Sequence, residues 1–72
     1  MLNRIGDVAR KLDEPEHVIR YWCQVFGIRV TRRPSGHRVF SEHTEAQVTE
    51  VHRLLRTEGY TIAGAKKKLG AQ

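Results

Sequence analysis

Two patterns of side chains meet in the stretch from Pro15 to Phe40, PEHVIRYWCQVFGIRVTRRPSGHRVF. The apolar side chains of its first half share the spacing of a single helix face: Val18, Ile19, Trp22 and Phe26. A proline at the start of a helix wastes no hydrogen bond, and a glycine commonly ends one. We therefore expect a helix that begins at Pro15 and is capped by Gly27, with Trp22 and Phe26 as its largest contributions to the core.

The helical period disappears after Gly27. Two short runs, residues 29–33 and 37–40, contain β-branched or aromatic residues and read as strands. Between them, Pro34 fixes its own φ angle and Gly36 is free to adopt a positive one. The second half of the stretch therefore predicts a β-hairpin with an arginine-rich tip.

The flanking segments predict three further helices. Apolar residues with helical spacing place the first from Arg4 to Leu12. Ser41 is a suitable N-cap for the next, which Gly59 closes, and Thr61 can cap a last helix that ends at Gly70. The residues expected to face inward from these helices are Ile5, Val8, Ala9, Leu12, Val48, Val51, Leu54, Leu55, Ile62, Ala65 and Leu69. The expected fold is mainly α: four short helices, with a two-stranded hairpin between the second and third, in a single domain over residues 1–72.

Charge is distributed unevenly along the chain. Thirteen Lys and Arg residues against eight Asp and Glu give a net charge of +5 and a pI near 10.0, which favours an anionic partner. The window from His17 to Ser41 has no acidic residue but holds five arginines: Arg20, Arg29, Arg32, Arg33 and Arg38. Arginine can grip phosphate or a guanine edge with two hydrogen bonds. This window therefore favours nucleic acid over a membrane surface as the partner.

Composition argues against several other classes of protein. The single cysteine, Cys23, cannot form an internal disulfide, and no apolar run approaches the ~20 residues that a membrane span needs. Charged residues interrupt the N-terminal apolar residues, so a secretory signal is not expected. Cys23 and the four histidines lack the short spacing of closed zinc sites, and no catalytic constellation is present. We expect a cytoplasmic, nucleoid-associated protein that is no enzyme and uses no cofactor.

The order of the elements suggests a function. Two short helices joined by a turn form a helix-turn-helix, whose second helix enters the major groove of DNA. The hairpin adds a wing that can grip phosphates or reach the adjoining minor groove. The residues predicted to contact DNA are Glu16, His17, Arg20 and Tyr21 in the recognition helix and Arg32, Arg33, His37 and Arg38 in the wing. Thr31, Lys66 and Lys67 are further candidates for anchoring the DNA backbone.

Four signatures resemble the MerR family in order and spacing: Ile5-Gly6-Asp7-Val8-Ala9, His17-Val18-Ile19-Arg20-Tyr21-Trp22, Ser35-Gly36-His37-Arg38-Val39-Phe40-Ser41 and Glu58-Gly59-Tyr60-Thr61-Ile62. The resemblance covers nearly the whole chain. It implies a winged helix-turn-helix domain that binds promoter DNA, usually as a dimer, and thereby controls transcription. A dimer would then form on DNA or through sequence outside this chain.

The chain departs from the family pattern at three positions. Glu14 stands where a small apolar turn residue is common, Cys23 where an acidic residue is common, and His37 replaces an aromatic residue of the wing. The cysteines of the metal-sensing members have no counterpart, so sensing is not implied.

Other interpretations remain open at this point. A small basic winged-helix protein can also bend DNA as an architectural protein or act as a recombination directionality factor. A third alternative is a module that docks an acidic protein partner. For individual residues, Arg20 can pair with Glu16 on the helix surface instead of contacting DNA, and strict alternation would turn Arg32 and Arg33 to opposite sides of the hairpin.

Overall fold

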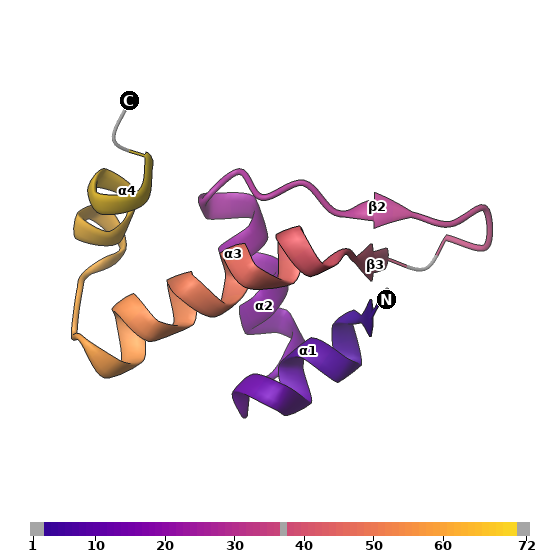
Figure 1. Cartoon of the computed structure of the whole chain (residues 1–72), viewed down its shortest axis with the longest axis horizontal. Helices are drawn as coiled ribbons and strands as arrows, with labels where there is room; N and C mark the ends of the chain where they lie inside the picture. Colours follow the sequence, from indigo (N-terminus) through magenta and orange to yellow (C-terminus); the bar gives the residue numbers. More distant parts are fainter. Residues whose placement is uncertain (1–2, 37, 71–72) are drawn as a thin grey trace.

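The computed structural model describes residues 3–36 and 38–70 of the chain (Figure 1). Its elements follow in the order β1 (Asn3–Arg4), α1 (Ile5–Leu12), α2 (Glu16–Val25), β2 (Thr31–Arg32), β3 (Arg38–Phe40), α3 (Glu42–His52), η1 (Arg53–Thr57) and α4 (Ile62–Gly70). The fold is mainly helical, with a small antiparallel sheet, and is consistent with the predicted winged helix-turn-helix. No helix within the described ranges has the length and apolar character of a membrane span.

The turn between α1 and α2 is short and contains one residue in the left-handed conformation. Asp13 has a φ of 55°, and the backbone N–H of Glu14 donates to the carbonyl of Ala9 at 2.9 Å. Pro15 is the N-cap of α2 rather than its first residue, so the helix begins one residue later than its proline suggested. Gly27 has a φ of 66° just after the helix, as expected of a residue that ends it.

The sheet contains a third strand that the sequence pattern did not predict. Its order is β1-β3-β2, so that β3 lies in the middle. Asn3 pairs with Phe40 on one side of β3, and Thr31 pairs with Val39 on the other. The expectation of a two-stranded sheet was therefore incomplete. Two residues are too few to show the alternation that identifies a strand. The strands that pair are also far apart in sequence, so no local pattern indicates the pairing.

Helix α3 begins where its cap was expected. The Ser41 hydroxyl accepts a hydrogen bond from the backbone N–H of Thr44 at 3.1 Å. The helix then continues as the π-turn η1, which the sequence pattern did not reveal, and Gly59 follows with a φ of 75°. Thr61 caps α4 by accepting from the N–H of Gly64 at 3.0 Å.

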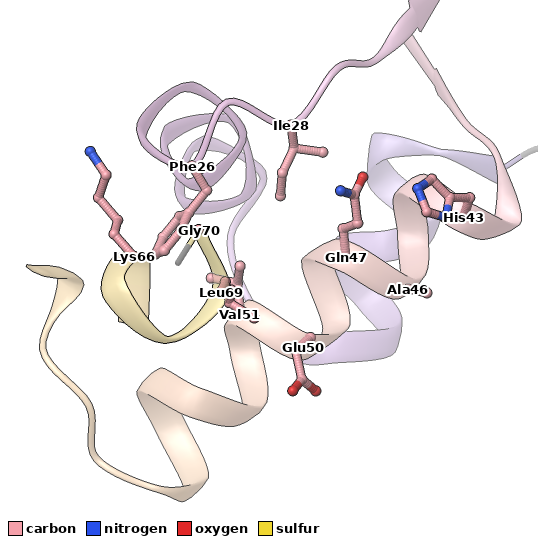
Figure 2. A pocket seen from close by; sticks show the side chains of 10 residues that line it. All are labelled: Phe26, Ile28, His43, Ala46, Gln47, Glu50, Val51, Lys66, Leu69 and Gly70. Atoms are coloured by element: carbon pink, nitrogen blue, oxygen red, sulfur yellow. The ribbon is translucent and has the colours of Figure 1, made fainter. Parts of the chain in front are cut away.

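Helix α4 packs less completely than predicted. Ala65 is fully buried, whereas Leu69 is 37% exposed. Leu69 and Phe26 line an open groove of about 570 Å³ between α4, the end of α2 and α3 (Figure 2). The expectation that Leu69 faces the core was therefore wrong, and Phe26 is only partly buried at the edge of the core.

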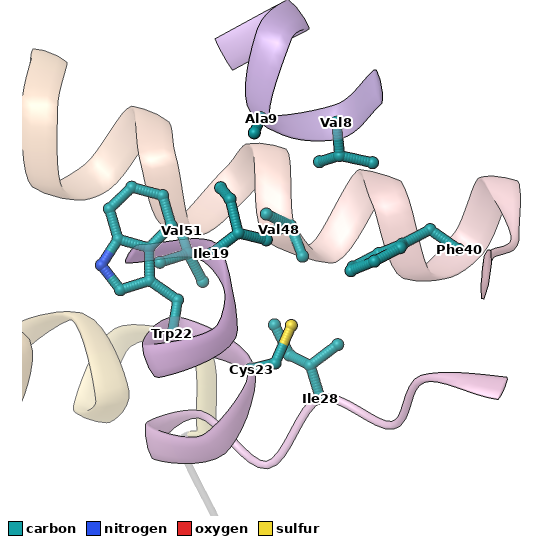
Figure 3. Packing of buried hydrophobic residues seen from close by; sticks show 9 residues of the cluster. All are labelled: Val8, Ala9, Ile19, Trp22, Cys23, Ile28, Phe40, Val48 and Val51. Atoms are coloured by element: carbon teal, nitrogen blue, oxygen red, sulfur yellow. The ribbon is translucent and has the colours of Figure 1, made fainter. Parts of the chain in front are cut away.

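The core lies where α1, α2, α3 and the sheet converge (Figure 3). Its main cluster of buried side chains consists of Val8, Ala9, Ile19, Trp22, Cys23, Ile28, Phe40, Val48 and Val51. Trp22 is only 2% exposed, which confirms its predicted place in the core. Because Ile19 and Trp22 point into this core, the opposite side of α2 is exposed to solvent and accessible to a ligand.

Candidate nucleic-acid interface

A groove of about 530 Å³ separates α2 from the hairpin. It is lined from α2 by His17, Arg20, Tyr21, Cys23 and Gln24, from the connecting segment by Ile28 and Val30, and from the strands by Arg32 and Arg38. We call it the α2–hairpin groove. The two basic segments that the sequence singled out therefore share one flank of the molecule, which a joint contact with one DNA duplex requires.

The exposed side chains of α2 in this groove form one helical stripe. His17, Arg20, Tyr21 and Gln24 follow the i, i+3, i+4, i+7 spacing. All four are exposed, and Tyr21 is 52% exposed despite its large aromatic ring. Gln24 was not among the predicted contact residues. The same spacing argument that found the core face, applied to the polar residues, could have found it.

Positive charge is concentrated in the hairpin. Among the described residues, no acidic side chain forms an ion pair with Arg32, Arg33 or Arg38. Moreover, Arg32 lies directly opposite Arg38 in the β2–β3 ladder. Like charges at opposed positions of an antiparallel pair repel each other. A negatively charged ligand in the groove would relieve this repulsion.

Arg20 has a weaker tie to an acid. Its Nη1 lies 3.7 Å from Oε1 of Glu16, and both side chains are about half exposed. Exposed pairs of this kind contribute little to stability, so the guanidinium can exchange this partner for a ligand. Glu16 itself does not line the α2–hairpin groove.

The remaining predicted residues lie outside the groove. Thr31 and Arg33 are exposed on the hairpin but do not line the groove, so Arg32 and Arg33 differ in the way that strand alternation implied. Lys66 and Lys67 are exposed on α4, at the other end of the long axis from the hairpin (Figure 1). His37 lies outside the described residues.

Cys23 lies at the floor of the groove and is 9% exposed. Burial raises the pKa of its thiol, and the positive charge of Arg38 opposes that shift. The thiol is therefore neutral near pH 7 and acts as a small apolar group. No group of three His, Cys, Asp or Glu side chains in the described ranges is arranged to hold a metal ion.

A helix-turn-helix followed by a basic hairpin on the same flank defines the class of winged helix-turn-helix DNA-binding proteins. Comparison with protein families agrees: the model described as "MerR HTH family regulatory protein" matches residues 3–72. The chain therefore belongs to the MerR family, whose members bind double-stranded DNA and regulate transcription. Searches of curated proteins and of solved structures found no match.

Proposed function

We propose that this chain binds specific sites in double-stranded DNA as a single winged helix-turn-helix unit. Helix α2 lies in the major groove, and the hairpin contacts the backbone or the adjoining minor groove. The observation that carries this proposal is the α2–hairpin groove, which brings an exposed polar stripe and uncompensated arginines to one flank. Both segments can then engage the same duplex.

Helix α2 supplies the contacts that read sequence. His17 and Arg20 are presented at the open side of the helix, and an arginine can bond both acceptors of a guanine in the major groove. Gln24 extends the stripe by one turn and has the amide chemistry that recognises adenine. Tyr21 can donate its hydroxyl to a phosphate. Glu16 orients Arg20 from the helix surface.

The hairpin supplies contacts that position the protein on DNA. Arg32 and Arg38 face the groove; Arg33 adds positive charge next to the tip, and the hydroxyl of Thr31, at the start of β2, can donate to a phosphate. Phosphate contacts of this kind add affinity without reading sequence. Lys66 and Lys67 lie on a separate surface, so they would bind a phosphate further along the duplex. Two copies on a symmetric site would fit the family's usual dimeric binding.

Selection of bound duplexes from a random pool, followed by a salt titration, tests the proposal. We expect one enriched motif, and an affinity that falls steeply with salt because bound phosphates release their counterions. Symmetric half-sites would support a dimer on DNA. Failure to enrich any motif, or an affinity that hardly changes with salt, would contradict sequence-specific binding through these arginines.

A further inference from the structure

Behind α2, on the side away from the α2–hairpin groove, a nearly buried carboxylate contacts an arginine and a histidine. The side chain of Glu14 is 10% exposed. Arg56 donates to both of its oxygens, from Nε at 2.8 Å and from Nη2 at 3.1 Å. Nε2 of His52 lies 3.6 Å from the same carboxylate. Glu14 belongs to the turn of the helix-turn-helix, so this contact ties the turn to the end of α3 and to η1.

The same guanidinium also contacts α2. The Arg56 Cζ lies 5.5 Å from the centre of the Trp22 ring, and the Trp22 and His52 ring centres are 6.1 Å apart. An arginine over an indole face is attracted by the ring quadrupole. Glu14, Trp22, His52 and Arg56, here called the turn cluster, therefore connect the turn, α2, α3 and η1.

The π-turn η1 carries the arginine of this cluster. The N–H of Glu58 donates to the carbonyl of Arg53 at 3.0 Å, an i→i+5 bond that widens the helix locally. Such turns are rare and frequently mark functional positions. Arg53, on the same turn, instead bonds Glu50 and Glu58, and among the described residues it forms no ion pair with α2. The two arginines of η1 thus serve different parts of the molecule.

Rotation of α2 about its axis is what the turn cluster controls. Residues i and i+2 of a helix differ by about 200° around its axis, so Arg20 and Trp22 point to opposite sides of α2. A contact that fixes Trp22 and the preceding turn therefore fixes the direction in which Arg20 enters the α2–hairpin groove.

We propose that Glu14 and Arg56 are positioning residues for DNA recognition: their ion pair over Trp22 sets the orientation of α2 and so the base contacts of the groove-facing stripe. This inference rests on the proposed function. It gives a role to Glu14, which departs from the small apolar residue common at this place in the family. The π-turn η1 is the segment that brings Arg56 to this contact.

The test compares two duplexes: the motif that the wild-type chain enriches and a scrambled duplex of the same base composition. Glu14→Gln keeps the shape of the side chain but removes its charge, and Arg56→Gln removes the other partner. For each variant we expect the affinity for the motif to fall by about tenfold, which is 1.4 kcal/mol, with little change for the scrambled duplex. The ratio of the two affinities is the decisive quantity, because loss of folded protein would lower both.

Arg53→Gln is the matched control, because it breaks an ion pair on the same π-turn that does not reach α2. Its affinity ratio should equal that of the wild type. Trp22 is the sole tryptophan, so its fluorescence emission reports the cluster directly. The emission should change in Glu14→Gln and Arg56→Gln but not in Arg53→Gln. Arg56→Lys, which keeps a cation near the ring but loses the bidentate pair, should restore part of the ratio.

Each result decides the matter. A reduced ratio in folded Glu14→Gln and Arg56→Gln, with an unchanged control, supports positioning. An unchanged ratio in folded variants overturns it and leaves the pair as a structural contact. If Glu14→Gln does not fold, the ratio of Arg56→Gln, altered at a half-exposed side chain, decides alone. A wild-type chain that enriches no motif would instead reject the proposed function, a distinct failure seen before any variant is compared.

Discussion

The arginines of the hairpin and those of η1 have the same side chain but opposite surroundings. In the hairpin, Arg32 and Arg38 oppose each other across two strands, with no acidic partner among the described residues. In η1, Arg53 bonds Glu50 and Glu58, and Arg56 bonds both oxygens of Glu14. The arginines of η1 are therefore paired within the fold, whereas those of the hairpin are the ones that we propose for ligand binding.

This difference shows that net charge is a poor guide to where a ligand binds. Of the thirteen basic residues, several are neutralised locally: Arg10 by Asp7, Lys11 by Glu45, and the two arginines of η1. The window without acids predicts the hairpin as the ligand-binding surface, because a cation there has no neighbour of opposite sign in sequence. Each prediction below alters one of the two regions, or a residue between them.

The largest effect is expected from Trp22→Ala, which removes the ring that Arg56 of η1 contacts. Removing a large buried aromatic side chain costs about 3–5 kcal/mol, which is most of the stability of so small a domain. We expect the chain to be unfolded at 25 °C, as measured by circular dichroism and urea titration. Tyr21→Ala, at the exposed neighbouring position, is the control and should melt close to the wild type. A cooperative wild-type melt for Trp22→Ala would remove Trp22 from the core.

Arg20 shares a feature with each set of arginines. It has an acidic neighbour, as the η1 arginines do, and it faces the groove, as Arg32 and Arg38 do. Arg20→Ala should lower the affinity for the selected motif by about 1–3 kcal/mol and relax preference at particular base pairs. Repeating the selection with the variant measures this directly. Equal loss at every sequence would assign Arg20 to phosphate instead.

Arg38→Gln should weaken binding to all duplexes about equally. The slope of log affinity against log salt should decrease by about one unit for the lost phosphate contact. Because the substitution also removes the repulsion with Arg32, the melting temperature should stay the same or rise slightly. A lower melting temperature with an unchanged salt slope would mean that Arg38 stabilises the fold, as the η1 arginines do, and does not contact DNA.

Arg53→Gln should give the reverse pattern, with a smaller effect. It removes hydrogen bonds to Glu50 and Glu58 at an exposed position, so a slight decrease in melting temperature is expected. The salt slope of DNA binding should be that of the wild type. If the slope decreased, the η1 arginine would have to contact the duplex, and the division between the regions would fail.

Acid should weaken the paired carboxylates outside the hairpin and leave the hairpin unaffected, with the smallest effect per group. Hydrogen bonds from Lys11 and Asn3 lower the pKa of Glu45, and a hydrogen bond from Arg53 lowers the pKa of Glu50. A carboxylate with a lowered pKa stabilises the fold above its unfolded pKa, and this contribution is lost as pH falls through the folded value. The melting temperature should therefore decrease between about pH 5 and pH 3.

A matched variant identifies the source of this acid sensitivity. Lys11→Gln should make the decrease shallower, because it removes the first cause of the Glu45 shift. A melting temperature that does not change with pH in this range would show that these pairs contribute nothing to the fold.

Much of the fold was predictable because its signals are local. Ser41 and Thr61 cap their helices, Gly27 and Gly59 have positive φ angles, and the helical stripes place Ile19 and Trp22 in the core. These features depend on residues within one or two turns of each other. Local rules of capping and periodicity describe them well.

What the sequence pattern missed depends on contacts distant in the chain. Strand β1 exists because Asn3 and Arg4 meet β3, and Leu69 stays exposed because nothing in the described chain covers it. Arg56, the partner of Glu14, is 42 residues away in sequence. It lies on a π-turn, which the spacing of apolar residues does not predict. In the candidate site, by contrast, Gln24 was overlooked although a local spacing rule includes it.

Strand β2 is one of the two outer strands of the sheet, because β3 lies between it and β1. Its outward backbone groups form an open edge, onto which another molecule could add a strand and begin aggregation. Both residues of β2 are exposed, and Arg32 places a fixed positive charge there. Two such edges repel each other, so the charge that we assign to ligand binding also keeps separate copies from joining into larger sheets.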